Sequence, residues 1–305
     1  MAPESFTIGI DLGGSSVKGV AVTPEGETLG QGSTDFDVAE PMEWAEAVKA
    51  LVDRLQRRRR KTSTARVGLA APGVAAADGR SIVHMPGRLE GLVGLDWSRF
   101  LQNVDPEIRQ PVPVLNDAHA ALLGELWLGA AKGFQNVILL TLGTGVGGAA
   151  MVDGQLLRGH TGKAGHLGHT CLDIDGAPDI SGLPGSLEDG IGNATVAERS
   201  RGRFSSTHEL IVAHQTGDAE ATKIWMRSVK ALAYSIGSFA NVLDPEAVII
   251  GGGIARAGDA LFEPLEKMVH DVEWKICGHE VTILPAQLGE LAGAYGAAYR
   301  ALNPG

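Results

Sequence analysis

A glycine-rich turn between two apolar runs occurs twice in this chain of 305 residues. The apolar run 137–142 leads into the turn Gly143–Gly148, and a second apolar run follows at 149–152. The same order recurs between residues 6 and 22. Both turns connect two predicted strands, whereas the glycines of a P-loop lead into a helix. Each turn alone is most simply a plain hairpin, but two such hairpins facing each other across a cleft are able to hold a polyphosphate from both sides.

The residues around the two turns suit anion and cation binding. Glycines let backbone N–H groups approach an anion, and Thr144 adds a hydroxyl donor. Asp11 stands directly before the first turn, and one carboxylate there is enough to hold Mg²⁺ through water. Lys18 is either a phosphate contact or a solvated strand residue. The sequence leaves both interpretations of Lys18 open.

Two further predicted strands end in polar or tight segments. The strand Arg66–Ala71 leads into a turn at Gly73 that brings backbone close to a ligand. A strand at 112–117 ends in Asn116 and Asp117, and a helix is predicted to follow. Ligands of open α/β sheets lie beyond the carboxyl ends of strands, where an aspartate accepts the proton of a hydroxyl that attacks a phosphoryl group. Helix capping is an equally sufficient reason for either residue.

Charge and composition narrow the partners. The formal net charge is −10, which argues against nucleic acid as a partner, and the basic run 57–61 is interpreted as a solvated helix end. No apolar stretch approaches the ~20 residues that span a membrane, and the first residues lack a signal peptide's features. Cys171 and Cys277 are too few for a disulfide framework. We therefore expect a cytoplasmic protein with reduced thiols and no membrane partner.

Several segments together resemble the ROK family of sugar kinases and related repressors. Gly159–His169 fits that family's signature, G-x-x-G-x-A-G-E-x-G-H, at every fixed position but one. The resemblance covers nearly the whole chain in the same order, and its other segments are Asp11–Gly14 with Lys18, Asn116–Glu125, Leu142–Gly148 and Val248–Ile254. It implies an α/β protein with an actin-like ATPase (ribonuclease H-like) fold, in which two α/β lobes surround a central cleft for ATP and sugar.

The resemblance also implies how the chain divides and what its residues do. Residues 1–115 with about 290–305 would form a small lobe, and 116–289 the large lobe, in a glucokinase-like, Mg²⁺-dependent kinase that is a homodimer. Asp117 would be the catalytic base. The implied sugar contacts are Gly73, Asn116, Asp117, His166, His169 and Glu188. The implied nucleotide contacts are Asp11, Gly13, Gly14, Ser15, Lys18, Gly143, Thr144, Gly145, Gly252 and Gly253.

The chain departs from the family pattern at two places. His166 replaces the signature glutamate, and a neutral histidine offers one donor and one acceptor where a carboxylate only accepts. Substrate preference is therefore expected to differ from glucose, toward a modified, amino or acidic sugar.

The second departure removes the three cysteines of the family's zinc loop, which His169 commonly completes. Residues 179–188 keep the glycine frame, with Asp179 and two serines at the cysteine positions. We predict no zinc, because zinc prefers thiolate and imidazole ligands, and a loop held by hydrogen bonds. A makeshift site from His160, His166, His169 and Cys171 is the alternative.

Three functions fit this pattern. An ATP-dependent sugar kinase is favoured, because Asp11, Lys18, Asp117 and both glycine turns are intact. A repressor would need a helix-turn-helix before the first hairpin, which begins by Thr7. A sugar-binding sensor without catalysis is the main alternative, and polyphosphate remains a second possible donor.

Overall fold

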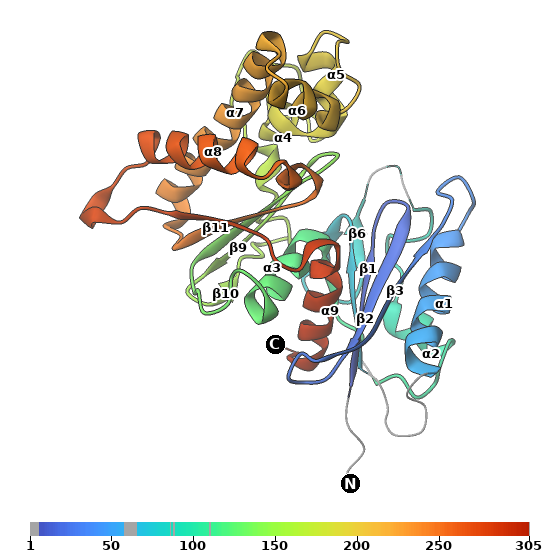
Figure 1. Ribbon diagram of the computed structural model, residues 1–305. Helices are drawn as coiled ribbons and strands as arrows, with labels where there is room; N and C mark the ends of the chain where they lie inside the picture. Colours follow the sequence, from blue (N-terminus) through green and yellow to red (C-terminus); the bar gives the residue numbers. More distant parts are fainter. Residues whose placement is uncertain (1–5, 58–65, 86, 88, 110, 305) are drawn as a thin grey trace. The chain divides into compact units, whose positions relative to one another are not determined.

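The computed structural model describes residues 6–57, 66–85, 87, 89–109 and 111–304 (Figure 1). The chain divides into two compact units. Unit 1 comprises the chain up to Gly133, Arg158–Ala164 and the segment from Gln287, and unit 2 comprises Phe134–Leu157 and Gly165–Ala286. The C-terminal segment thus returns to the first unit. The basic residues 58–61 lie outside the described residues.

The sheet of unit 1 has the strand order β3-β2-β1-β4-β7. β1 pairs antiparallel with β2, β2 pairs antiparallel with β3, and β1, β4 and β7 run parallel. The strands are β1 (Thr7–Leu12), β2 (Ser16–Val22), β3 (Thr28–Asp35), β4 (Arg66–Ala71) and β7 (Val114–Asn116), and a separate two-stranded sheet joins β5 (Val74–Ala75) and β6 (Ile82–His84).

The sheet of unit 2 repeats this plan with the order β10-β9-β8-β11-β12. Again three strands are antiparallel neighbours, and two further strands run parallel to the first strand of the hairpin. The strands are β8 (Val137–Leu142), β9 (Val146–Val152), β10 (Gln155–Leu156), β11 (Ala247–Gly251) and β12 (Thr282–Pro285). Each glycine turn of the sequence therefore joins the first two strands of one sheet.

Helices cover both faces of the sheet of unit 1 (Figure 1). The helical spacing of apolar residues such as Trp44, Val48 and Leu51 predicts a helix at about 41–60, and this apolar stripe is buried in α1 (Glu43–Arg57). α9 (Ala292–Leu302) lies on the opposite face, α3 (Asp117–Leu128) packs beside α9, and α2 (Trp97–Gln102) is capped by Asp96.

Glycine residues allow α9 to pack closely against β1 and α3. A Cβ atom at Gly9 of β1 would overlap the carbonyl oxygen of Ala294, and one at Gly296 would overlap that of Ala120 in α3. α9 can therefore touch both the strand and α3 backbone to backbone. This contact brings the start of α9 to the end of β1, where Asp11 lies.

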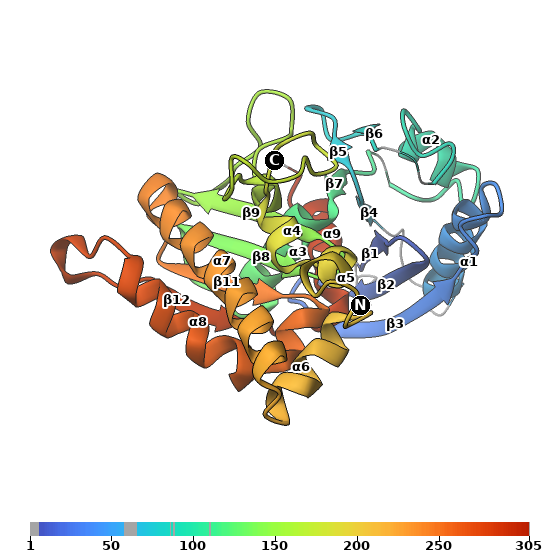
Figure 2. The same ribbon diagram turned by 90° about the horizontal axis from the view of Figure 1, so that it is seen from above.

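Unit 2 places its two long helices on one side of the β9-β8-β11 strands (Figures 1 and 2). Side chains of β8 and β11, such as Ile138 and Ile250, share a core with Trp225 and Leu232 of α7. The helices are α4 (Leu187–Ile191), α5 (Val196–Arg199), α6 (Thr207–Gln215), α7 (Ala219–Leu243) and α8 (Asp259–Val272). Short 3₁₀ turns lie at Leu167–His169, Asn193–Thr195, Gly253–Ala257, Ile276–Gly278 and Gly289–Leu291.

The sequence also predicts helices at 194–201, about 256–269 and 290–302, and these three begin or end elsewhere in the structure. The predicted helix 194–201 is a 3₁₀ turn followed by the short α5, and α8 begins at Asp259 instead of Arg256 because Gly258 has a φ of 58°. α9 begins two residues later than predicted, after a 3₁₀ turn. None of the described helices is long and apolar enough to cross a membrane.

Candidate active site

The β1–β2 hairpin of unit 1 presents Asp11 beside the start of α9. The turn is closed by the backbone N–H of Gly13, which donates to the Ser16 carbonyl oxygen at 2.8 Å. A Cβ atom at Gly293 would overlap the Asp11 carboxylate, so only glycine allows the helix to approach so closely. Burial raises the pKa of Asp11 to about 7, the nearby Asp117 carboxylate raises it as well, and Lys18 acts against both.

Lys18 lies opposite Asp11 in the β1–β2 register, but its ammonium group pairs with another carboxylate. Lys18 Nζ is 3.0 Å from Glu290 Oε2. The sequence left a phosphate contact or a solvated residue open for Lys18, and the structure shows an ion pair with Glu290, which lies far along the chain.

Asn116 and Asp117 form a hydrogen-bonded pair where β7 passes into α3. Asn116 Oδ1 caps the helix by accepting from the N–H groups of Ala118 and His119 at 3.0 and 3.2 Å. Asn116 Nδ2 donates to Asp117 Oδ1 at 2.8 Å. Asn116 is 5% exposed, whereas Asp117 is exposed to solvent. The capping role that the sequence left open for Asn116 is therefore real, and the same amide also orients the carboxylate of Asp117.

Gly73 is tied to the same pair. Its carbonyl oxygen accepts from Asn116 Nδ2 at 3.0 Å. Its φ is 97°, and a Cβ atom there would overlap the carbonyl oxygen of His84. Glycine is required at this turn both for the backbone conformation and for space. The turn after β4 and the end of β7 are therefore fixed relative to each other within unit 1.

The signature segment 159–169 changes unit along its length. His119 Nε2 of α3 lies 2.9 Å from the Ala164 carbonyl oxygen, and Arg158 Nη2 donates to the Ala76 carbonyl oxygen at 3.0 Å. These contacts hold residues 158–164 in unit 1, and the chain enters unit 2 at Gly165. The buried His119, which the sequence analysis did not single out, is thus a structural anchor of the signature.

The glycine turn of unit 2 is held by α4 and by the 3₁₀ turn Asn193–Thr195 that follows it. The N–H groups of Asn193 and Ala194 donate to the carbonyl oxygens of Gly143 and Thr144, both at 2.9 Å. Glu188 Oε2 accepts from the Val146 N–H at 2.8 Å. A Cβ atom at Gly145 would overlap the Glu188 carboxylate. Glu188, predicted as a sugar contact, therefore also supports the predicted phosphate turn.

The second glycine pair of unit 2 lies near the same turn. β11 runs parallel to β8 with Gly251 opposite Thr141, so both strands end at one edge of the sheet. Gly252 has a φ of 86°, and a Cβ atom there would overlap the backbone of Leu142. Apart from the glycine and its two chain neighbours, no heavy atom of the described residues lies within 4 Å of the positions that Cβ atoms would take at Gly143 and Gly253. This open space leaves room for a ligand beside Gly143 and Gly253, and their contact with a nucleotide stays a prediction.

His169 is held by the loop that replaces the zinc loop. His169 Nδ1 lies 2.7 Å from Asp179 Oδ2. Asp179 Oδ1 accepts from the backbone N–H and hydroxyl of Ser181 at 2.8 and 2.6 Å and from the Leu183 N–H at 3.1 Å. Burial works to raise the pKa of Asp179, but these hydrogen bonds outweigh it and hold the pKa well below its usual range. His166, the other predicted sugar contact here, begins the 3₁₀ turn Leu167–His169.

This loop does not fit a zinc ion. Bonds of about 2.1 Å at a tetrahedral angle separate two zinc ligands by roughly 3.4 Å. His169 and Asp179 are closer than that, and both Asp179 oxygens accept hydrogen bonds. No group of three or more His, Cys, Asp or Glu side chains in the described part of the chain is arranged to hold a metal ion. The absence of zinc stays a prediction, which a metal analysis of chelator-washed protein tests.

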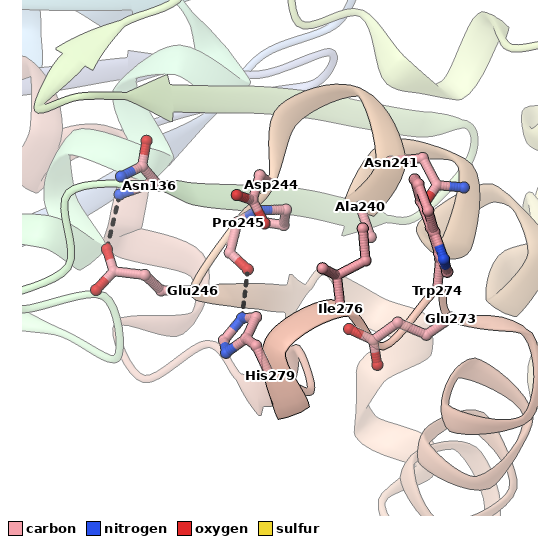
Figure 3. Close-up of a pocket in the computed structure, with 10 residues that line it drawn as sticks. All are labelled: Asn136, Ala240, Asn241, Asp244, Pro245, Glu246, Glu273, Trp274, Ile276 and His279. Carbon is pink, nitrogen blue, oxygen red and sulfur yellow. Dashed lines mark hydrogen bonds between the residues drawn. The ribbon is translucent and has the colours of Figure 1, made fainter.

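A cavity of about 520 Å³ lies elsewhere in unit 2 (Figure 3). Its polar groups are largely engaged: Glu246 Oε2 accepts from the N–H groups of Gln135 and Asn136, and His279 Nε2 lies 3.4 Å from the Pro245 carbonyl oxygen. Its lining includes none of the site residues that the sequence predicted. We therefore do not assign the predicted chemistry to this cavity.

Comparisons with known families, sequences and structures match nearly the whole length of this chain. A model of the ROK family matches residues 7–303. A glucokinase of Halalkalibacterium halodurans is 31% identical over 288 residues, which cover 87% of this chain and 85% of that protein. An N-acetylmannosamine kinase of Escherichia coli O7:K1 is 28% identical over 303 residues, with 97% and 98% covered. The crystal structure of a ROK family glucokinase from Streptomyces griseus in complex with glucose and AMPPNP has a TM-score of 0.80 at 25% identity and covers 97% of this chain and 98% of that one.

Proposed function

The chain belongs to the ROK family, and from this we propose that it transfers the γ-phosphoryl group of ATP to a hydroxyl of a hexose or modified hexose. It is a carbohydrate kinase with the actin-like ATPase fold, as the sequence predicted. The arrangement of Asn116 and Asp117 is the observation that carries the proposed mechanism. The proposed substrate class includes N-acetylated sugars, since one similar protein is an N-acetylmannosamine kinase.

Asp117 serves as the general base in this proposal. The sugar hydroxyl oxygen forms a bond to the γ-phosphorus while its proton passes to the Asp117 carboxylate. The bond to the β-phosphate oxygen breaks, and ADP leaves with the electron pair. Asn116 Nδ2 fixes one oxygen of Asp117, so the carboxylate does not need to reorient at the moment of transfer. Asn116 itself is buried and cannot supply the base.

Mg²⁺ fits beside Asp11. Burial and the Asp117 carboxylate both disfavour the charged form of Asp11, and a cation bound through water would relieve both effects. When bound, Mg²⁺ neutralises charge on the phosphates. Gly13, Gly14 and Ser15 supply the first phosphate turn, and the second is the turn at Gly143–Gly145. Gly252 and Gly253 take the adenosine side.

The proposed sugar side combines Gly73, Asn116, His166, His169 and Glu188. Asn116 offers its amide, and His169 offers Nε2, because Nδ1 is engaged with Asp179. His166 in place of a glutamate adds a donor, which favours a sugar with an extra acceptor such as an N-acetyl or carboxylate group. The expected homodimer is a further proposal, which light scattering during size-exclusion chromatography measures.

The experiment is a coupled ADP-release screen with Mg·ATP against hexoses, amino sugars, N-acetyl sugars and sugar acids. Asp117→Asn is expected to lower turnover about 10²–10⁴-fold, which corresponds to roughly 3–5 kcal/mol of barrier. Asp96→Asn, at the cap of α2, is the matched control and is expected to keep full turnover. Sugar binding without turnover in the wild type would instead support the sensor function.

A further inference from the structure

In the contact between His169 and Asp179, the aspartate side chain is more buried than the histidine side chain. The Asp179 side chain is 1% exposed and the His169 side chain 26%. Asp179 therefore lies behind the imidazole, and the more exposed ring is the part that can meet a ligand.

Asp179 can only accept a hydrogen bond from His169. Its other oxygen, Oδ1, receives three donors from Ser181 and Leu183, an arrangement that stabilises the ionised carboxylate. An ionised carboxylate has no proton to donate. At 2.7 Å from Asp179 Oδ2, His169 Nδ1 must therefore carry the proton.

We propose that Asp179 is a positioning residue that holds His169 in the Nδ1-protonated tautomer, so that Nε2 presents a lone pair to a hydroxyl of the substrate. This proposal rests on the proposed function, since it takes His169 as a sugar contact. The neutral ring then accepts a hydrogen bond from the sugar and does not donate one.

A metal ion on Nδ1 would have the opposite effect on the ring. It would occupy the Nδ1 lone pair and leave the proton on Nε2, which would then be a donor. The loss of the cysteines thus changes what His169 offers the substrate as well as how the loop is held. A sugar hydroxyl satisfies either form because it both donates and accepts. A fluorine atom in place of that hydroxyl cannot donate, so this chain is expected to reject the corresponding deoxyfluoro sugar.

Asp179→Asn reverses the arrangement with little change of shape. The asparagine Oδ1 still accepts from Ser181 and Leu183, and its amide group then replaces Oδ2 beside His169. Because the amide donates, His169 Nδ1 must accept and the proton moves to Nε2. The control is Asp173→Asn in the same loop, where the aspartate accepts a local hydrogen bond from the Asp175 N–H and is exposed.

The first test is nitrogen-15 NMR of the histidine rings at neutral pH, with the His169 signal assigned by its loss in His169→Gln. The wild type and Asp173→Asn are expected to show the proton on Nδ1, and Asp179→Asn on Nε2. A wild-type ring with its proton on Nε2, or with both nitrogens protonated, would overturn the proposal. So would one equivalent of zinc on the purified wild type that Asp179→Asn loses. These readouts do not depend on turnover, so they stand apart from the outcome of the kinase assay.

The second test uses the sugar that the kinase screen selects and its deoxyfluoro analogues. For the natural sugar, Asp179→Asn is expected to change kcat/KM much less than for the deoxyfluoro analogue, because a hydroxyl pairs with either tautomer of His169. The variant is also expected to narrow the gap between sugar and fluoro analogue at one ring position. An equal loss for sugar and analogues at every position would show that Asp179 only supports the loop, and would refute the positioning role.

Discussion

Two replacements of Asn116 distinguish its contribution to folding stability from its proposed contribution to catalysis. Asn116→Ala removes the helix cap of α3, which contributes about 1 kcal/mol. It also leaves the Gly73 carbonyl oxygen without the amide donor at 3.0 Å, at a cost of about 1–3 kcal/mol. The sum predicts a loss of roughly 2–4 kcal/mol in the free energy of unfolding. Asp117 loses its fixed orientation in the same variant, so kcat is expected to fall.

Asn116→Asp keeps the cap but changes the chemistry. A carboxylate oxygen still accepts from the N–H groups of Ala118 and His119, so less stability is lost than with alanine. The donor to Asp117 becomes a second carboxylate at hydrogen-bond distance, and two carboxylates so close raise the pKa of the pair. The acid limb of the kcat/KM profile is therefore expected to move to higher pH in this variant, and to move further than in Asn116→Ala, which loses only the amide donor to Asp117.

Urea denaturation measures the loss in the free energy of unfolding, and the pH dependence of kcat/KM measures the shift of the acid limb. The control is Asp96→Ala, which removes only the cap of α2, where Asp96 Oδ1 accepts from the Arg99 N–H at 3.1 Å. It is expected to cost about 1 kcal/mol and leave the kinetics unchanged. If Asn116→Ala costs no more than this control, or Asn116→Asp leaves the acid limb where it is, the hydrogen bonds of Asn116 do not have the effects argued above.

Three further changes test other contacts. Gly296→Ala is expected to destabilise the fold by about 1–3 kcal/mol, because its methyl group would overlap the Ala120 carbonyl oxygen, whereas Gly253→Ala, which meets open space, should leave the thermal midpoint unchanged. Glu125→Gln should cost about 1.5–3 kcal/mol in urea denaturation, because the buried carboxylate accepts from backbone N–H groups of three residues; an unchanged midpoint would contradict this. Asp11 has a raised pKa, so its contribution to stability is full below 3.8 and is lost as pH rises through about 7. Asp11→Asn should therefore gain stability relative to the wild type as pH rises from 3.8 to about 7, with no further gain above 7, and its turnover with Mg·ATP should be lower; a parallel pH dependence of the two stabilities would refute the assignment.

Local patterns in the sequence predicted most of the elements. Apolar residues at helical spacing, such as Trp225, Val229 and Leu232, predict a helix at 219–243, and the long helix α7 has these bounds, Ala219–Leu243. Asp218 caps its first turn by accepting from the Ala221 N–H, and Asp244 ends it in a left-handed conformation. Both signals lie within a few residues of the helix ends. The strands of the two hairpins were equally visible, because apolar runs next to glycine turns are local features too.

Contacts between distant segments could not be predicted in the same way. The sequence placed Glu188 in a loop, but it lies in α4, a helix of five residues that is too short for a periodic pattern. Glu290, which pairs with Lys18, and two of the residues that donate to Glu125 lie far along the chain, at the start of the C-terminal segment. No local pattern near Lys18 or Glu125 indicates these partners. The pairing of His169 with Asp179 depends on a turn at Gly182, whose φ is 86°. Residue types identified the candidates, but only the fold shows what orients each of them.

The repeated sheet explains why one carboxylate marks the proposed cation site. Asp11 and Thr141 occupy matching positions, each second from the end of its strand and followed by Leu-Gly. Asp11 pairs with Ala70 of the parallel neighbour β4, as Thr141 pairs with Gly251 of β11. The same backbone position thus carries an acid in unit 1 and a neutral hydroxyl in unit 2. Because the glycine turns offer N–H groups in both units, both suit phosphate, but only unit 1 adds the charge that Mg²⁺ requires. The proposed placement of Mg²⁺ in unit 1 therefore rests on one residue at an otherwise repeated position.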